Sequence, residues 1–212
     1  MDITWHGHSC FRLKSSTAAV VCDPYGKSLG LGTLRLKGDV LTMSHEHPGH
    51  NYAEALKGSE PFVIAGPGEY EVKGVFVVGV RTAHDARDGG NLGLNTAYSI
   101  TMEGLTVCHL GDLGHKPTQA QVEELGVIDV LLVPVGGHNT ISPGLAAEVV
   151  NLLDPSLVIP MHYRSPNRPE LEPLEAFLAE MGVSHPVPVD VLKVSPTKLP
   201  DEAQVVLLEM KV

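Results

Sequence analysis

Three apolar runs without polar alternation constrain the fold of this chain more than any other feature. They read DVLTMS at residues 39–44, DVLLVPV at 129–135 and SLVIPMH at 156–162. A strand with one face in water alternates apolar and polar residues, so a continuous apolar run indicates a strand covered on both faces. The chain is therefore expected to build a sheet that lies between other layers of secondary structure.

Further strands are indicated by short apolar segments that stand between glycine and proline turns. They are predicted at 3–7, 10–13, 18–23, 61–66, 69–72, 75–84, in a hairpin over 96–112 that turns at Glu103-Gly104, and at 204–212. After about residue 110 the strands alternate with helical patterns. This order predicts an α/β fold, and the absence of a composition break indicates one domain over residues 1–212.

Helices are predicted at 51–58, 116–126, 141–155 and 169–182. Two of them carry clear start signals. Thr118 is followed three residues later by Gln121, which is the pattern of a capping box, and Gly126 ends that segment. Ser142 stands directly before Pro143, which is favoured at the first position of a helix.

Charge and cysteine content restrict the class of partner. The net charge is −10 and no cluster of lysine and arginine occurs, which argues against a nucleic-acid surface but not against a small phosphorylated substrate. No apolar run reaches the roughly 18 residues of a membrane span, and the first residues do not resemble a secretory signal. Cys10, Cys22 and Cys108 lack paired spacing and are interpreted as reduced core thiols, so we expect a cytoplasmic protein. The sequence does not indicate an oligomeric state.

Histidine is abundant, with 11 residues, and part of it is clustered. The stretch SHEHPGH places His45, His47 and His50 in one loop after an apolar strand. Three more polar residues follow other apolar strands, namely His84, Asp112 and His162. Functional sites of α/β folds gather in the loops beyond strand ends, so these six side chains are expected to converge on one cleft.

Imidazole and carboxylate are ligands that suit zinc, manganese or iron. Six of them could hold two divalent ions, an arrangement that cleaves ester or phosphoester bonds with a metal-activated water. Taken singly, His84 and His162 are more often loop-capping residues, and Asp112 reads as a turn residue. His45 and His47 differ because the H-x-H spacing puts both rings on one side of an extended segment. It is the joint pattern that indicates a metal site.

These motifs together resemble the metallo-β-lactamase superfamily. SHEHPGH resembles its H-x-H-x-D-H loop, and TAHD, HLGDLGH and IPMHYR resemble its later metal motifs in the same order. ITWHGHSCF, VCDP and PVGGHNTISP resemble the branch that includes the ascorbate-6-phosphate lactonase and other metal-dependent hydrolases. The resemblance extends over nearly the whole chain. It implies a four-layer αββα sandwich with the metals at one edge, between the two sheets.

The resemblance also implies which residues hold each ion. The first metal would be bound by His45, His47 and His84, and the second by His50 and His162, with Asp112 bridging the two. Asp112 and His162 are expected to take part in catalysis as well. The expected cofactor is zinc, as one or two ions per chain, with manganese or iron as alternatives. His8 and Asp23 are expected either to lie beside the metal loop and support its ligands or to serve only in packing.

Position 49 departs from the family pattern, because Gly49 stands where the family has aspartate. Pro48-Gly49 predicts a type II turn in which glycine relieves a positive φ. Without that carboxylate, Asp112 is the only carboxylate of the protein expected to bind the metals directly. The second ion should therefore be bound weakly, or an anionic substrate should complete its set of ligands. Glu46 is a poor substitute, since the alternation of an extended segment points it away from His45 and His47.

We therefore expect a metal-dependent hydrolase that acts on an ester-type bond of a small anionic substrate. The alternative is a non-catalytic metal- or ligand-binding protein that retains the fold. The enzyme is favoured because six ligand positions of the family are occupied by histidine or aspartate. The net negative charge disfavours a nucleic-acid-processing protein. Substrate specificity is expected to lie in the loops 29–38, 85–95 and 164–170.

Overall fold

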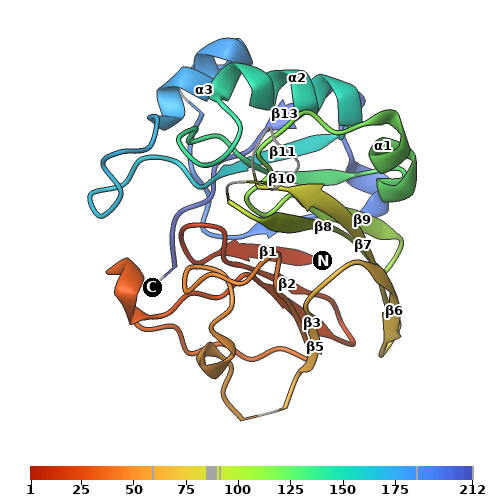
Figure 1. Cartoon of the computed structure of the whole chain (residues 1–212). Coiled ribbons are helices and arrows are strands. Elements are labelled where there is room, and N and C mark those ends of the chain that lie inside the picture. The colour runs from red at the N-terminus through yellow and green to blue at the C-terminus, as the bar shows by residue number, and fades with distance from the viewer. Residues whose placement is uncertain (59, 85–89, 91, 185, 212) are drawn as a thin grey trace.

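Two β-sheets face each other in the computed structural model, which describes residues 1–211 except 59, 85–89, 91 and 185 (Figure 1). The six-stranded sheet has the order β12-β1-β2-β3-β4-β5, and the seven-stranded sheet has the order β13-β11-β10-β9-β8-β7-β6. In the first sheet the strands are β1 Asp2–Trp5, β2 Phe11–Lys14, β3 Ala19–Cys22, β4 Val40–Thr42, β5 Phe62–Ile64 and β12 Leu192–Lys193. In the second they are β6 Gly68–Val72, β7 Val75–Ala83, β8 Leu94–Met102, β9 Leu105–His109, β10 Val130–Pro134, β11 Leu157–Met161 and β13 Gln204–Val205.

The main core lies between the sheets, where side chains of both interdigitate. Phe11, Leu13 and Val20 of the first sheet are fully buried against Ile100 and Leu132 of the second. The three uninterrupted apolar runs form β4, β10 and β11, whose residues are all buried. The predicted two-sheet sandwich is confirmed, and burial on both faces explains why these strands carry no polar alternation.

The α-helices pack on the outer face of the seven-stranded sheet (Figure 1). They are α1 Gln119–Leu125, α2 Pro143–Leu153 and α3 Leu174–Glu180. The capping box of Thr118 and Gln121 is formed, and the Ser142 hydroxyl accepts a hydrogen bond from the amide of Leu145, as predicted. The third helix is shorter than the predicted 169–182. Proline at position 173 disfavours helical backbone in the residue before it, so the helix begins only after that proline.

The outer face of the six-stranded sheet is covered differently. Loops and two one-turn 3₁₀ helices, η1 Lys27–Leu29 and η2 Ala53–Ala55, place Tyr25, Leu36 and Leu56 against the buried residues of β3 and β4. The helix predicted at 51–58 is wrong apart from that single turn. Its backbone pairs instead with the preceding loop, because Leu36 donates to the carbonyl of Ala55 and accepts from the amide of Lys57.

The C-terminal segment connects the two sheets. Only Gln204–Val205 of the strand predicted at 204–212 pairs as β13, in parallel with β11. The chain then crosses to the first sheet, where Met210 bridges to Trp5 and the amide of Lys211 donates to the Trp5 carbonyl at 2.8 Å. A further 3₁₀ turn, η3 Pro196–Lys198, precedes this segment.

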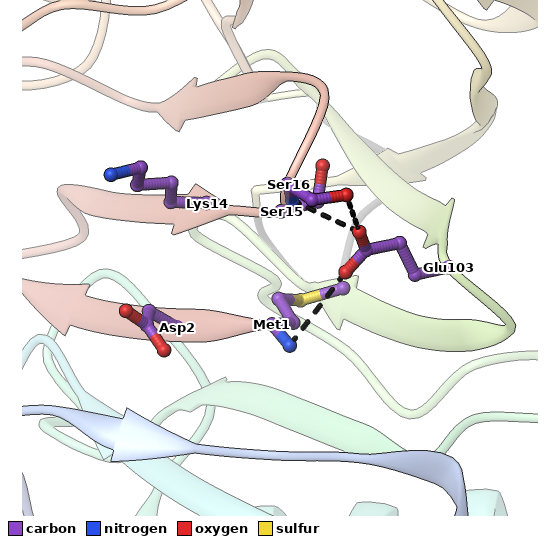
Figure 2. Close-up of a pocket in the computed structure, with 6 residues that line it drawn as sticks. All are labelled: Met1, Asp2, Lys14, Ser15, Ser16 and Glu103. Atoms are coloured by element: carbon purple, nitrogen blue, oxygen red, sulfur yellow. Dashed lines mark hydrogen bonds and ion pairs between the residues drawn. The ribbon is translucent and has the colours of Figure 1, made fainter.

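Glu103 joins the two sheets at the end of the sandwich away from the predicted metal cluster. It sits in the predicted turn between β8 and β9, where its carboxylate accepts hydrogen bonds from the amide and the hydroxyl of Ser16 (Figure 2). The ammonium group of Met1 lies 3.9 Å from the same carboxylate and donates to the carbonyl of Val194 at 2.9 Å. These contacts line a polar pocket and fix the first strand in place.

The three cysteines are free and buried, as predicted for core thiols. None of the helices within the described part of the chain has the length and apolar character that crossing a membrane requires.

Four strands end at the same edge of the sandwich. In the seven-stranded sheet β9, β10 and β11 are parallel, and β7 runs in the same direction because β8 is antiparallel to both β7 and β9. The loops after β7, β9 and β11 therefore emerge together, and the loop after β4 of the other sheet meets them.

Candidate metal centre

The loop after β4 folds into a tight turn that differs from the predicted one. The carbonyl of His47 accepts from the amides of His50 at 2.8 Å and of Asn51 at 3.1 Å. Gly49 does not have the positive φ that a type II turn requires, so that prediction is wrong. Space, rather than backbone angle, explains the glycine. A Cβ atom at position 49 would lie 3.1 Å from His47 Nδ1 and 3.2 Å from His8 Nε2.

Buried hydrogen bonds orient the first and third histidines of this loop. Asp23 accepts from the amide of Ser44 at 2.8 Å, from its hydroxyl at 2.5 Å, and from His50 Nδ1 at 2.8 Å. The Ser44 hydroxyl oxygen in turn lies 2.9 Å from His45 Nδ1. Both rings are held by their Nδ1 atoms, so each turns its Nε2 atom toward the cleft. Asp23 thus lies next to the metal loop, one of the two expected placements, and sequence reasoning missed Ser44.

Backbone contacts position the two ligands that follow β7 and β9. His84 Nδ1 donates to the carbonyl of Asn139 at 2.8 Å. The amide of Asp112 donates to Asn95 Oδ1 at 2.9 Å. The residue before Asp112 is Gly111 with φ of +57°, and a Cβ atom there would collide with Asn95 Oδ1 at 2.3 Å. Only glycine lets the chain pass this close to the asparagine that holds the aspartate.

One carboxylate oxygen lies at the centre of the cluster. Asp112 Oδ2 is 3.2 Å from His50 Nε2, 3.3 Å from His84 Nε2 and 3.3 Å from His162 Nε2. Burial alone would raise the pKa of Asp112, yet the imidazoles of His162 and His50 hold that pKa well below its usual range. Burial likewise opposes protonation of His50, but Asp112 and Asp23 outweigh it and raise its pKa to about 10.

All six predicted ligands come together at this edge. Three overlapping sets have potential ligand atoms within 4.8 Å of one another: His45, His84 and Asp112; His45, His47 and His50; and His8, His50 and His162. The ring centroid of His45 is 4.8 Å from that of His84 and 5.9 Å from that of His47. Asp112 thus lies beside predicted ligands of both metal sites, and His8 lies in the same set as His50 and His162.

The donor set fits a divalent cation. His45 Nε2 and Asp112 Oδ1 are buried and have no hydrogen-bond partner among the described residues. Buried polar atoms are rarely left unpaired, so such atoms in one cluster indicate a missing partner. Burial lowers the pKa of His45 to about 4, which keeps its imidazole neutral and able to bind metal.

The cluster opens into a cleft of about 270 Å³. Its lining contains four predicted ligands of the first site, His45, His47, His84 and Asp112, together with His162, His8, Glu46, Leu92, Asn139 and Arg168. Arg168 comes from the loop 164–170, which was expected to shape specificity, but the sequence did not single it out. Of the second expected specificity loop, residues 85–89 and 91 lie outside the described residues.

Other histidines have structural partners. His109 Nε2 lies 2.8 Å from the carbonyl of Ser9, and His115 Nε2 accepts from the amide of Ala83 at 3.1 Å. Tyr163 packs on Trp5 with ring centroids 5.5 Å apart. The abundance of histidine therefore has two causes, a metal-type cluster and ordinary hydrogen-bonded positions.

Comparison with known proteins finds a matching family profile, similar sequences and similar structures. The profile of the beta-lactamase superfamily domain matches residues 2–162. A UPF0173 metal-dependent hydrolase of Pyrococcus abyssi is 41% identical over 194 residues, covering 78% of this chain and 85% of the relative. A crystal structure of a proposed Zn-dependent hydrolase of the metallo-β-lactamase superfamily from Thermotoga maritima aligns with a TM-score of 0.79 and 40% identity, covering 98% of this chain and 97% of its own. A metallo hydrolase of Ignicoccus hospitalis shares the fold with a TM-score of 0.69 at 22% identity, over 92% and 99% of the two chains.

Proposed function

The chain belongs to the metallo-β-lactamase superfamily and, within it, to the UPF0173 metal-dependent hydrolase family, and from this membership we propose that it hydrolyses an ester-type bond in a small anionic substrate. The observation that carries the proposal is the position of Asp112. One of its oxygens lies within 3.3 Å of three imidazole nitrogens that come from three different loops. Such convergence of buried histidines on one carboxylate is typical of a two-metal hydrolase.

The proposed division of ligands is as follows. As the family resemblance implies, His45, His47 and His84 would hold the first ion and His50 and His162 the second, with Asp112 shared between them. The ligand sets among the described residues place His45 with both His84 and His47, and His50 with His162. Zinc is the proposed metal, with manganese and iron as the alternatives to be compared. When bound, the ions supply a Lewis acid that activates water and stabilises the negative charge developing on the substrate.

The protein itself prepares the site in two ways. Asp23 and Ser44 fix the rings of His50 and His45, and Asn139 fixes the ring of His84, so that little reorganisation is needed when a substrate binds. Burial of Asp112 keeps its charge from being screened by water.

Two observations favour an anionic substrate. Arg168 lines the cleft and brings a positive charge to it, although its Nε is paired with Glu170 Oε1 at 2.5 Å. Gly49 removes a carboxylate from the metal shell, which leaves excess positive charge when two ions are present and weakens the second ion. A phosphate or carboxylate on the substrate offsets the excess charge of the ions and is attracted to Arg168. The proposed substrate classes are phosphodiesters, phosphate-bearing esters and phosphorylated lactones. Lactones are included because ITWHGHSCF and PVGGHNTISP resemble the lactonase branch.

To test this, the metal is removed from the protein, and zinc, manganese or iron is added back. Hydrolysis is then measured for a panel of phosphodiesters, phosphate-bearing esters and lactones with and without phosphate. The expected result is metal-dependent hydrolysis with a higher kcat/KM for the anionic member of each matched pair. Tight binding of metal and anion without turnover of any substrate class would favour the alternative, a non-catalytic binding protein. The cytoplasmic location expected from the cysteines stays a prediction.

A further inference from the structure

We propose that His8 is a direct ligand of the second metal ion and takes the place of the carboxylate that the family loop has at position 49. This inference rests on the proposed function, since it concerns a ligand of the same metal centre. His8 comes from the loop between β1 and β2, far in sequence from the metal motifs, and it lines the cleft.

The space beside Gly49 gives the first argument. A Cβ atom at that position would approach His8 Nε2 to 3.2 Å and His47 Nδ1 to 3.1 Å. Both contacts are tighter than ordinary van der Waals packing. A longer acidic side chain at position 49 would therefore compete with the His8 ring for one volume. Position 49 therefore faces the His8 ring, which occupies space that an acidic side chain there would enter.

The distances between ligand atoms give the second argument. Tetrahedral zinc with bonds of about 2.0–2.1 Å places its ligand atoms about 3.3 Å apart. His8 Nε2 is 3.1 Å from His50 Nε2, which is 3.2 Å from Asp112 Oδ2, which is 3.3 Å from His162 Nε2. Each of these three successive pairs of atoms has the spacing of neighbouring ligands on one ion. His8, His50 and His162 also form one of the three candidate ligand sets.

The backbone gives the third argument. His8 has φ of 51° and His162 has φ of 53°, so both sit in the left-handed region, which few non-glycine residues adopt although histidine does so more often than most. The two positions are tied together, because the amide of His162 donates to the carbonyl of His8 at 3.4 Å and the indole of Trp5 donates to the same carbonyl at 3.0 Å. Strained backbone of this kind is retained mainly where a side chain must point in a required direction.

A ring-to-ring hydrogen bond between His8 and His50 would explain the 3.1 Å distance without a metal. The two roles differ in the affinity that is lost. Removing a group that only orients a ligand costs about 10–100-fold in metal affinity. Removing a ligand costs more, because the ion loses a coordination bond. A neutral imidazole does not restore the missing negative charge, so the second ion keeps its charge deficit whichever residue completes its shell.

The experiment is a calorimetric titration of metal-free protein with zinc, combined with elemental analysis of the loaded protein. The variant is His8→Asn, because asparagine tolerates left-handed backbone but is too short to reach the ion. His162→Asn makes the same change at a proposed ligand in the same conformation. His138→Asn is the matched control, since His138 has φ of 60° and belongs to none of the three ligand sets.

We expect His8→Asn and His162→Asn to weaken the weaker zinc site by more than about 100-fold, leaving the tighter site within a few-fold, and His138→Asn to change neither. A smaller loss in His8→Asn overturns the ligand role of His8. Circular dichroism of the metal-free proteins verifies folding, and His8→Gly, which also suits this backbone, replaces His8→Asn if the latter unfolds. If the unaltered protein binds no zinc, manganese or iron at all, it is the proposed function that fails.

A second variant tests the shared volume. Gly49→Asp in the His8→Asn background should bind the second zinc ion at least tenfold more tightly than His8→Asn alone, because the ring no longer blocks the carboxylate. Gly49→Asp in the presence of His8 should give less than that gain. Equal affinities of the double variant and of His8→Asn alone would contradict the exchange of histidine for aspartate.

Discussion

At the scale of single residues, much of the histidine and aspartate cluster could be predicted from the sequence, because its members follow apolar strands at short spacing. His45, His47 and His50 share one loop, and a joint pattern of this kind does not arise from loop capping. The position of His8 could not be predicted from the sequence, because it depends on how the β1–β2 loop packs against His50, 42 residues away. The turn at Gly49 was predicted wrongly because a Pro-Gly pair also suits turns without positive φ, and steric crowding by His8 left no local signal.

Asp112 carries the largest single-residue prediction. Asp112→Ala should lower the affinity for the second ion and the turnover of loaded protein by more than about 100-fold each, because the charge shared by both ions is removed. Metal content by elemental analysis and kcat/KM on the best substrate are the measurements. Asp39→Ala is the control, an acidic residue that is paired with Lys73 outside the cleft. Full metal content and activity in Asp112→Ala would exclude the bridging role.

Arg168 is expected to act in substrate binding rather than in chemistry. Arg168→Ala should raise KM for a phosphorylated substrate about tenfold or more, with a smaller change in kcat, since a charge-assisted contact to the substrate is lost. Steady-state kinetics on a phosphorylated substrate and on its neutral analogue measure this. Arg168→Lys should retain part of the effect. A similar rise in KM for both substrates would show that Arg168 does not distinguish the charged substrate from the neutral one.

At the scale of elements, helix and strand starts were predictable wherever local chemistry decides them. The capping box at Thr118 and the Ser142-Pro143 pair are both formed as read from the sequence. Elements that depend on tertiary pairing were not. The segment at 51–58 pairs with Leu36 in place of extending a helix, and residues after Val205 leave one sheet for the other. Hydrophobic pattern cannot distinguish such crossings from a continuous strand.

The N-cap of α2 provides a stability test at this scale. Ser142→Ala should lower the free energy of unfolding by about 1 kcal/mol, because the amide of Leu145 loses the hydroxyl that accepts its hydrogen bond. Urea unfolding of the metal-free protein measures the change. Ser142→Asn keeps a capping oxygen and should stay within a few tenths of a kcal/mol of the unaltered protein. Equal destabilisation by both substitutions would assign the effect to something other than the cap.

At the scale of the whole molecule, the sandwich buries its thiols while it exposes its metal cleft. Burial raises the pKa of Cys22 to about 12 and that of Cys10 well above its usual value. In native buffer at pH 8 all three thiols should react with a disulfide reagent at least about a hundredfold more slowly than in denatured protein, since the thiolate is the reactive form. A colorimetric thiol titration with and without denaturant decides this. Rapid reaction of a native thiol would contradict the burial of Cys10 before β2 or the packing of β3 or β9.

We infer that one edge of the sandwich holds two unequal metal ions on either side of Asp112. Anomalous diffraction at the zinc absorption edge, from crystals of metal-free protein soaked in zinc, tests it most directly. We expect two peaks within about 2.0–2.2 Å of their ligand atoms, a stronger one among His45, His47 and His84 and a weaker one at His50 and His162. Two peaks of equal occupancy would contradict the inequality attributed to Gly49, and the absence of any peak beside Asp112 would contradict the metal centre itself.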